Sequence, residues 1–355
     1  MKLSIIQECD APNGVRPPVS RYQELVREAI AAEEAGFSTY MVSEQHFNDT
    51  IATLSAPESF FGYLAAKTSA IRLRVGSFVM LSFNHPLRSA ERAATLDVLS
   101  NGRFEIGTAR SNNPQTLKTF GIDPNDTRTM WEESIQIIRG ALTRENFEFD
   151  GRIWKIPPVT IMPRTVQLPH PPIHVSATSI ETHFNAGRYG IGVMTGNSLP
   201  GGWDYLAEAM DSYKNGLAEV DVAGGRLTES RAALAAVAYC APTEQAALNE
   251  ASEVAGRFVG LIVQWYDQLS AASKDYKAFA GLRSVVDRKD GLPQLIDRSP
   301  YLTIGTPEFF LKRCRKLRDL GYNELICRID GMSHEQHLAT IKLLGKEVIP
   351  QIESW

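Results

Sequence analysis

The sequence predicts a single (β/α)8 barrel, the α/β fold in which parallel strands alternate with helices. The chain has 355 residues, a length at which such barrels commonly form one domain. Short apolar runs alternate with longer helical patterns along most of it, as in repeated βαβ units. Polar residues gather directly after several apolar runs, where a barrel keeps its active site. We therefore expect residues 1–355 to form one barrel domain.

The apolar runs predict the strands, and the helical patterns between them predict the helices, in chain order. Strands are expected at 3–7, 39–43, 73–79, 104–108, 173–177, 190–195, 233–240 and 324–329. Helices are expected at 21–35, 58–68, 86–99, 130–142, 180–188, 204–217, 244–269, 307–320 and 333–349. Thr306-Pro307 is typical of a helix start, and Gly36, Gly102 and Gly321 are typical of left-handed helix ends.

Two insertions interrupt this alternation. Residues 147–154 read as a hairpin around Asp150-Gly151, and a proline-rich stretch follows it to Pro172, before the fifth strand. Residues 274–299 form a polar interruption before the eighth strand. A long loop near the catalytic end of a barrel is a candidate lid, and a merely mobile insertion is an equal alternative.

The composition excludes several classes of partner. Lys and Arg total 37 against 41 Asp and Glu, so a net charge of -4 provides no basic field for nucleic acid and no polybasic patch for a membrane. The four cysteines are far apart and suggest buried thiols, not a metal site. No apolar run suits a signal peptide or a membrane span. We expect a cytoplasmic protein that binds small molecules.

The segment Glu44-Gln45-His46-Phe47 follows the second expected strand. It would bring an acid, an amide and an imidazole to the catalytic end of a barrel. His46 is the first candidate for chemistry. A single histidine near a strand end is, however, often only structural.

A second group of polar residues suits a phosphate. Arg110 follows the fourth strand, Arg128 begins the next helix, and Ser179 lies at a helix start after the fifth strand, with Thr178 and Thr182 beside it. Guanidinium groups match phosphate oxygens, and the amides of a helix N-terminus complete an anion site. The alternative is that both arginines pair with surface acids and Ser179 only caps its helix.

Several short motifs together resemble the bacterial luciferase-like family of flavin-dependent monooxygenases. The resemblance extends from the first strand almost to Pro350. Its motifs are Glu44-Gln45-His46-Phe47, Asn84-His85-Pro86-Leu87-Arg88, Asn101-Gly102-Arg103-Phe104, Gly107 to Arg110, Gln264-Trp265-Tyr266-Asp267 and Ile304-Gly305-Thr306-Pro307-Glu308.

The resemblance implies a barrel that binds reduced FMN at its C-terminal face. Matched by position, Arg110, Arg128, Ser179 and Thr182 would hold the FMN phosphate, with Thr178 beside them. Phe78-Val79 matches a position where the family has a non-proline cis peptide bond under the isoalloxazine. Trp265 matches an aromatic residue of the flavin and substrate pocket, although a core tryptophan is the simpler interpretation.

One departure from the family pattern concerns chemistry. Luciferase-type catalytic subunits have two adjacent histidines after the second strand, and here Gln45 takes the place of the first and His46 that of the second. Glutamine cannot accept a proton near pH 7, so oxidation of a long-chain aldehyde and light emission are not expected.

The expected activity is that of a two-component monooxygenase that uses reduced FMN as cosubstrate, supplied by a separate flavin reductase. Dioxygen would be activated as a flavin C4a-peroxide and would oxygenate a small organic substrate, by Baeyer-Villiger oxidation or by hydroxylation. His46 would protonate, orient or stabilise the oxygenated flavin, with Gln45 bonding substrate or flavin. The alternatives are a deazaflavin-dependent hydride transfer and a non-catalytic flavin-binding partner subunit.

The helices after the second and third strands suggest an assembly. Residues 59–66 and 90–99 mix small and large apolar side chains over much of their surface. Relatives in the family dimerise through this region, so a symmetric homodimer is the expectation. The alternative is that both helices are buried within their own barrel.

Overall fold

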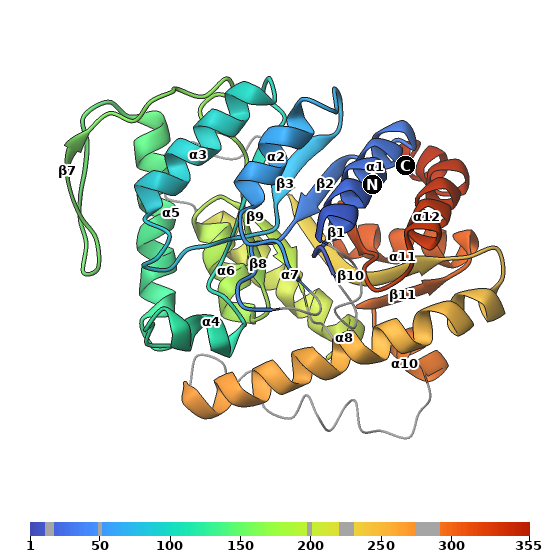
Figure 1. Ribbon diagram of the computed structural model, residues 1–355. Coiled ribbons are helices and arrows are strands. Elements are labelled where there is room, and N and C mark those ends of the chain that lie inside the picture. Colours follow the sequence, from blue (N-terminus) through green and yellow to red (C-terminus); the bar gives the residue numbers. More distant parts are fainter. Residues whose placement is uncertain (11–17, 49–51, 197–200, 220–230, 274–291) are drawn as a thin grey trace.

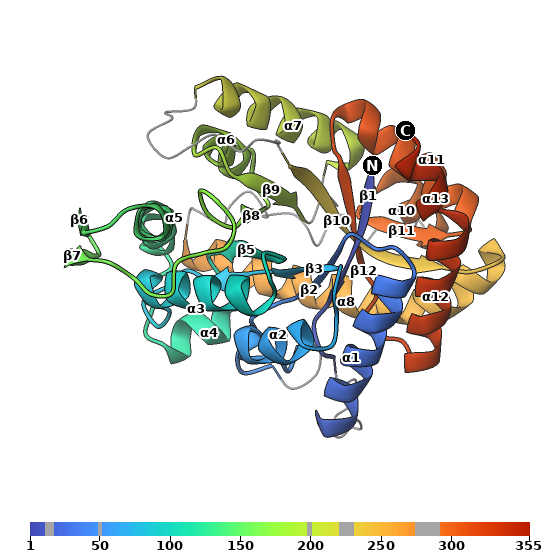
Figure 2. The same ribbon diagram turned by 90° about the horizontal axis from the view of Figure 1, so that it is seen from above.

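The computed structural model describes residues 1–10, 18–48, 52–196, 201–219, 231–273 and 292–355. In these residues a ring of eight parallel strands is surrounded by helices (Figures 1 and 2). The strands of the ring, in spatial order, are β1 (Lys2–Gln7), β2 (Thr39–Val42), β3 (Arg72–Val75), β5 (Phe104–Ala109), β8 (Ile173–Ala177), β9 (Gly192–Thr195), β10 (Ala232–Cys240) and β12 (Glu324–Arg328). β10 pairs with both β9 and β12, which closes the ring. The predicted barrel is therefore confirmed.

The third predicted strand is divided. β3 ends at Val75, and β4 (Phe78–Val79) resumes the pairing with β5. Gly76 lies in the break, and a Cβ atom at this position would approach the Met41 side chain to 2.7 Å. A side chain at this position would therefore force the flexible end of the Met41 side chain to move. β11 (Leu302–Gly305) was not predicted as a strand, and it pairs with the last part of β10, from Val237 to Cys240.

The predicted helices are all present around the ring. They are α1 (Pro18–Glu34), α2 (Pro57–Ala65), α3 (Pro86–Leu99), α5 (Thr127–Thr143), α6 (Ile180–Arg188), α7 (Gly202–Ala218), α8 (Glu244–Ala272), α11 (Pro307–Leu320) and α12 (His334–Glu347). Three short helices were not predicted: α4 (Pro114–Thr119), α10 (Leu292–Arg298) and α13 (Ile349–Glu353). The Thr306 side chain caps α11 by accepting a hydrogen bond from Phe309 N, and Gly321 ends it with φ of 102°. These terminal signals were predicted from residue type alone.

The first predicted insertion is confirmed as a hairpin of β6 (Phe147–Asp150) and β7 (Lys155–Val159). It projects away from the barrel (Figure 1). The Glu133 carboxylate of α5 anchors its turn by accepting hydrogen bonds from the backbone amides of Arg152, Ile153 and Trp154. Of the second insertion, residues 274–291 lie outside the described part, so the suggested lid is not tested; α10 lies in the remainder.

A buried ion cluster fills the barrel interior near the N-terminal ends of the strands. We call Arg74, Glu105, His174 and Glu324 the basal cluster. Arg74 donates to Glu105 Oε2 at 2.7 Å and to Glu324 Oε2 at 3.1 Å. His174 Nε2 lies 3.1 Å from Glu105 Oε2, and Arg231 reaches Glu105 Oε1 at 2.5 Å. Opposite charges therefore face one another at this end of the barrel.

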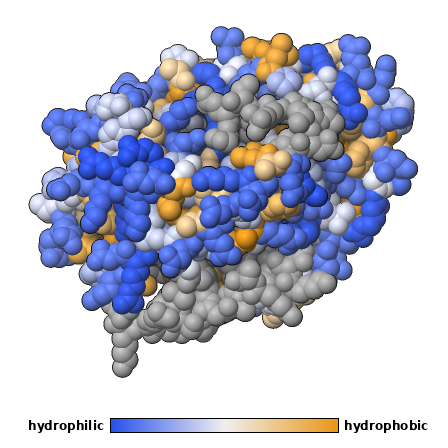
Figure 3. All heavy atoms as spheres, turned by 180° about the vertical axis from the view of Figure 1, so that it is seen from behind, coloured by the Kyte–Doolittle hydropathy of each residue, from blue (hydrophilic) through white to orange (hydrophobic). Residues whose placement is uncertain are grey.

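The surface is mostly polar on the face in Figure 3, where apolar residues form small separate groups. Large exposed apolar side chains include Tyr63, Leu99, Met162 and Leu168. None of the described helices combines the length and the apolar character that a membrane span requires. The four cysteines are buried free thiols, as predicted.

Candidate active site

A pocket opens at the C-terminal ends of the barrel strands, which we call the barrel mouth. It contains about 1360 Å³ of empty space, part of it open to solvent. α8 lies along this end of the barrel (Figure 1) and contributes Ile262 and Tyr266 to the lining. The polar residues of the lining lie at the ends of strands, shortly after them or in the first turn of the next helix: Glu8, Ser43, Glu44, Gln45, Ser77, Arg110, Ser111, Asn112, Arg128, Ser176, Thr178, Thr182 and Arg328.

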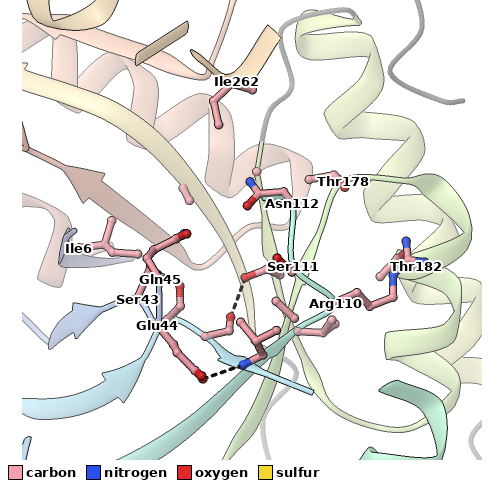
Figure 4. Close-up of a pocket in the computed structure, with 18 of the residues that line it drawn as sticks. Ile6, Ser43, Glu44, Gln45, Arg110, Ser111, Asn112, Thr178, Thr182 and Ile262 are labelled. Atoms are coloured by element: carbon pink, nitrogen blue, oxygen red, sulfur yellow. Dashed lines mark hydrogen bonds between the residues drawn. The ribbon is translucent and has the colours of Figure 1, made fainter. Parts of the chain in front are cut away.

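One side of the pocket gathers the residues predicted to hold a phosphate. Arg110 follows β5, Arg128 is in the first turn of α5, and Thr178 and Thr182 flank the start of α6. We call these four residues the basic wall. Figure 4 shows Arg110, Thr178 and Thr182 on the same side of the cavity. The structure therefore brings these four residues, distant in sequence, to one pocket; that they bind phosphate stays a prediction.

Ser179 lies behind the basic wall and does not line the pocket. Its hydroxyl caps α6 by accepting a hydrogen bond from Thr182 N at 3.3 Å, and it lies 2.9 Å from Thr182 Oγ1. The cap fixes the first turn of α6, which directs its amide groups and Thr182 toward the cavity. Arg128 also contacts the exposed carboxylate of Glu181 at 3.1 Å. Such an exposed pair is weak, so it leaves the guanidinium able to bind a ligand.

The donor set of the basic wall suits the phosphate of a flavin mononucleotide. Two guanidinium groups supply positive charge and pairs of N–H donors, and two hydroxyls supply further donors. The N-terminus of α6 adds the positive end of a helix dipole. The residues present therefore fit an anionic group.

Glu44 organises the segment after β2. Its carboxylate accepts hydrogen bonds from Val79 N at 3.0 Å and Asn84 Nδ2 at 2.6 Å, and His46 Nε2 lies 2.9 Å away (Figure 4 shows the contact to the Val79 amide). Gln45 lines the pocket beside it. The imidazole of His46 lies behind Glu44 and does not line the cavity; it packs against Phe83 with ring centroids 5.2 Å apart.

The peptide bond between Phe78 and Val79 is trans, so the expectation of a cis bond there was wrong. In the described residues, the cis bonds are Met162-Pro163 and Leu168-Pro169. The trans geometry keeps Phe78 and Val79 in register with β5 while Val79 N donates to Glu44. Val79 lines the pocket, whereas Phe78 is fully buried and packs against Phe104.

Trp265 is buried in α8 and does not line the pocket, which favours the simpler interpretation of a core residue. Its helical neighbour Tyr266 and Ile262 line the cavity instead. Because successive helical residues point about 100° apart, a match displaced by one position selects the wrong face.

Sequence reasoning missed the polar residues that follow the first and last strands of the ring. Glu8 and Arg328 both line the pocket, and Ser43 donates to Glu8 Oε1 at 3.0 Å. Burial raises the pKa of Glu8 to about 7, and nearby Arg328 opposes that shift. The signal was available, because both residues lie at strand ends, but neither belongs to a motif.

A further acidic group lies between α1 and α12, outside the pocket. Ligand atoms of Glu24, Glu28 and His334 come within 4.8 Å of one another. Arg21 Nη1 lies 3.0 Å from Glu28 Oε1, so a cationic side chain already neutralises the buried carboxylate. Ion pairing accounts for this cluster, and the prediction that no metal is bound stays a prediction.

Comparisons with known proteins agree with this geometry. The family model described as luciferase-like monooxygenase matches residues 1–324. The oxygenase component of the flavin-dependent trigonelline monooxygenase of Acinetobacter baylyi is 25% identical over 356 aligned positions, covering 99% of this chain and 95% of that protein. An uncharacterised protein of Sinorhizobium fredii is 33% identical over 165 residues, and that alignment spans only 46% of either chain.

Solved structures share the barrel. A monooxygenase from Streptomyces bottropensis superposes with a TM-score of 0.81 at 24% identity, covering 99% of both chains. The oxygenating constituent of 3,6-diketocamphane monooxygenase from Pseudomonas putida, in complex with FMN, has a TM-score of 0.78 at 19% identity, covering 99% of this chain and 98% of that one. A coenzyme F420-dependent tetrahydromethanopterin reductase from Methanopyrus kandleri has a TM-score of 0.73 at 20% identity, covering 99% of both. At these identities the likeness supports the fold alone.

The family match covers all but the last part of the chain, and the mouth of the barrel presents the acid, amide and arginine residues on which the resemblance rested. The prediction of a flavin-dependent monooxygenase is confirmed at that level, and the chain belongs to the luciferase-like monooxygenase family.

Proposed function

We propose that this protein is the oxygenase of a two-component system, which takes reduced FMN from a separate flavin reductase and oxygenates a small organic substrate. The observation that carries the proposal is the basic wall, where two arginines and two threonines face one cavity. Two relatives support it by their names, one as an oxygenase component and one as an FMN complex.

The basic wall would hold the FMN phosphate, with Ser179 fixing the helix turn behind it. Val79 at the pocket surface and Phe78 beneath it would support the ring system, and Trp265 would stabilise α8 from the core. Reduced flavin, when bound, supplies the electrons for dioxygen activation. The protein contributes position and exclusion of water.

Glu44, Gln45 and His46 would control hydrogen bonding beside the reacting groups. Glu44 keeps the amide of Val79 and the imidazole of His46 in fixed positions. Gln45 reaches the cavity and would bond substrate or flavin directly. His46 Nε2 shares a hydrogen with Glu44 Oε1, so it would hold a proton one residue behind the pocket surface. Whether the reaction is a Baeyer-Villiger oxidation or a hydroxylation is left open.

The test combines the purified protein with FMN, NADH and an unrelated flavin reductase. We expect tight binding of reduced FMN and flavin-dependent oxygen consumption. His46→Ala should keep the flavin but release hydrogen peroxide in place of oxygenated product. Product yield per reduced flavin, over a panel of ketones and aromatic compounds, measures how much of the oxidised flavin leads to oxygenated product. A wild-type protein that binds no reduced FMN would contradict the proposal.

A deazaflavin-dependent hydride transfer is the second candidate, because a coenzyme F420-dependent enzyme shares the fold. Such an enzyme would transfer a hydride to or from its substrate without consuming oxygen. Oxygen uptake with reduced FMN therefore separates the two candidates. A non-catalytic partner subunit would bind flavin but produce neither product nor oxygen uptake above that of free flavin.

We also propose that two copies associate through α2 and α3. Tyr63 and Leu99 expose 57% and 59% of their surfaces on these helices, and Met162 beside them exposes 67%. Exposed apolar groups of this size favour association. Light scattering should give twice the mass of one chain, and Leu99→Arg should return it to one. A single-chain mass for the wild type would contradict the dimer.

A further inference from the structure

The pocket has a second polar side, across the barrel from the basic wall. In the ring, β1 is separated from β8 by four steps in either direction, and β12 is separated from β5 in the same way. Glu8 and Arg328, which end β1 and β12, therefore lie opposite the residues that end β8 and β5. Figure 4 shows Ile6, which precedes Glu8 on β1, and Ser43 facing Thr178 and Thr182 across the cavity.

The Glu8 carboxyl has only part of its hydrogen-bonding capacity used. Its Oε1 atom accepts from Ser43 Oγ at 3.0 Å. Its Oε2 atom is buried, and no hydrogen-bond partner for that atom exists in the described part of the chain. Buried polar atoms are nearly always paired, so an unpaired one at a pocket surface indicates a missing ligand group.

The charges around Glu8 decide which ligand group fits. Asp330 accepts a hydrogen bond from Glu8 N at 2.8 Å and from Arg328 Nε at 3.1 Å, so it already neutralises the guanidinium. Burial raises the pKa of Glu8 to about 7; Asp330 and Asp10 add to the rise, while Arg328 and Ser43 oppose it. Tyr301, at the start of β11, also faces the group. Below pH 7 the carboxyl is protonated, and it then offers an O–H donor to the cavity.

We infer that Glu8, positioned by Ser43, binds a carbonyl oxygen of the organic substrate on the side of the pocket opposite the basic wall. This inference rests on the proposed function, because it assigns the substrate end of the same pocket. The protonated carboxyl donates through Oε2, while its Oε1 atom stays bonded to Ser43. A ketone or aldehyde has the acceptor that this donor requires. Substrates without an acceptor oxygen leave Oε2 unpaired and gain no affinity when the carboxyl is protonated.

The test uses two probes of the same shape, acetophenone and α-methylstyrene, which has a methylene group in place of the carbonyl oxygen. Calorimetric titrations at pH 6 and pH 8, with and without FMN, measure both dissociation constants. For a single group with pKa about 7, acetophenone should bind about tenfold more tightly at pH 6 than at pH 8. The constant for α-methylstyrene should not change with pH.

Glu8→Gln keeps a donor of similar size but cannot ionise, so it should bind acetophenone equally at both pH values. Glu148→Gln, an exposed substitution on the hairpin, should retain the difference of about tenfold. A wild-type affinity for acetophenone that does not depend on pH would overturn the inference. So would the same dependence for α-methylstyrene, or no acetophenone binding at either pH.

A measurement on the wild type alone gives the same answer if Glu8→Gln fails to fold. Repeating the pH 8 titration in buffers of different ionisation enthalpy counts protons, and acetophenone should take up about one proton when it binds. Release of protons, or no uptake, would overturn the inference. Because the titrations without FMN do not depend on flavin, failure of this assignment can be distinguished from failure of the proposed oxygenase activity.

Discussion

At the N-terminal end of the barrel strands, the Glu105 carboxylate is held by Arg74, Arg231 and His174. At the barrel mouth, the Glu8 carboxyl accepts one hydrogen bond from Ser43, and its other oxygen has no hydrogen-bond partner in the described residues. Both groups are carboxyls on strands of the same ring. Neighbouring Arg74 holds the pKa of Glu105 well below its usual range, while burial raises that of Glu8 to about 7.

The difference separates two uses of buried charge. In the basal cluster each charge is compensated by the protein, so the groups have no capacity left for a ligand. At the mouth, one oxygen of the Glu8 carboxyl has no hydrogen-bond partner in the described residues, which is costly for the folded state and useful for binding. In (β/α)8 barrels generally, the N-terminal end of the strands contributes to stability and the C-terminal end carries the active site, and this distribution of charge agrees with that division.

Breaking the basal cluster should give the largest effect. Glu105→Gln removes the negative charge that compensates Arg74 and Arg231, and it should lower the free energy of unfolding by about 3–5 kcal/mol, the usual cost of leaving buried partners uncompensated. Urea unfolding at pH 7 measures it. Glu148→Gln on the exposed hairpin should change the free energy by less than about 0.5 kcal/mol. A loss below about 1 kcal/mol for Glu105→Gln would remove the distinction between the two ends.

The alternation of apolar runs predicted the eight strands of the ring because strand and helix patterns are local properties of the sequence. Terminal signals at Thr306, Ser179 and Gly321 were equally local. The basic wall was predicted because each member follows a strand or starts a helix, and a barrel brings such positions together.

The remaining residues depend on packing that no local pattern encodes. The break after Val75 lies where Met41 of another strand approaches Gly76, a contact between distant parts of the chain. His46 was expected in the pocket, but the Glu44 carboxylate holds its ring outside the lining. Glu8 and Arg328 were missed because their relation arises from the closure of the ring, which places β1 beside β12.

A change of pH should also distinguish the two ends of the barrel, through its effect on the stability of the folded state. Burial lowers the pKa of His174 from its usual 6.5 to about 4, so the unfolded chain binds the proton first and stability falls as the pH falls through this window. Between pH 7 and pH 5 the loss should be about 2 kcal/mol. Comparing the wild type with His174→Gln at both pH values isolates the loss of stability due to His174, because the contributions of other groups, including His183, cancel. A difference between the two proteins that does not change with pH would contradict a buried neutral imidazole.

The basic wall should affect binding but not stability. Arg110→Ala should weaken FMN binding by about 1.5–3 kcal/mol, the range for a charge-assisted hydrogen bond, with the free energy of unfolding nearly unchanged. Fluorescence titration of the flavin measures the binding. Arg318→Ala, which removes an exposed cation on α11, is the matched control and should leave the dissociation constant as it is. If Arg110→Ala binds FMN as the wild type does, the phosphate lies elsewhere.

The smallest expected effect has the opposite sign. Because the pKa of Glu8 is raised to about 7 from a usual 4.5, the unfolded state loses its proton first as the pH rises, and stability falls between pH 4.5 and pH 7. Glu8→Gln should therefore stabilise the protein at pH 8 by about 1–2 kcal/mol, a value reduced from the full shift because the residue is partly open to solvent. At pH 5 the carboxyl is protonated and the gain should nearly vanish. Urea unfolding of both proteins at the two pH values measures the difference. If Glu8→Gln destabilised the protein at pH 8, the mouth would hold the Glu8 carboxylate as firmly as the basal cluster holds Glu105. Incomplete compensation would then not explain why the mouth is a binding site.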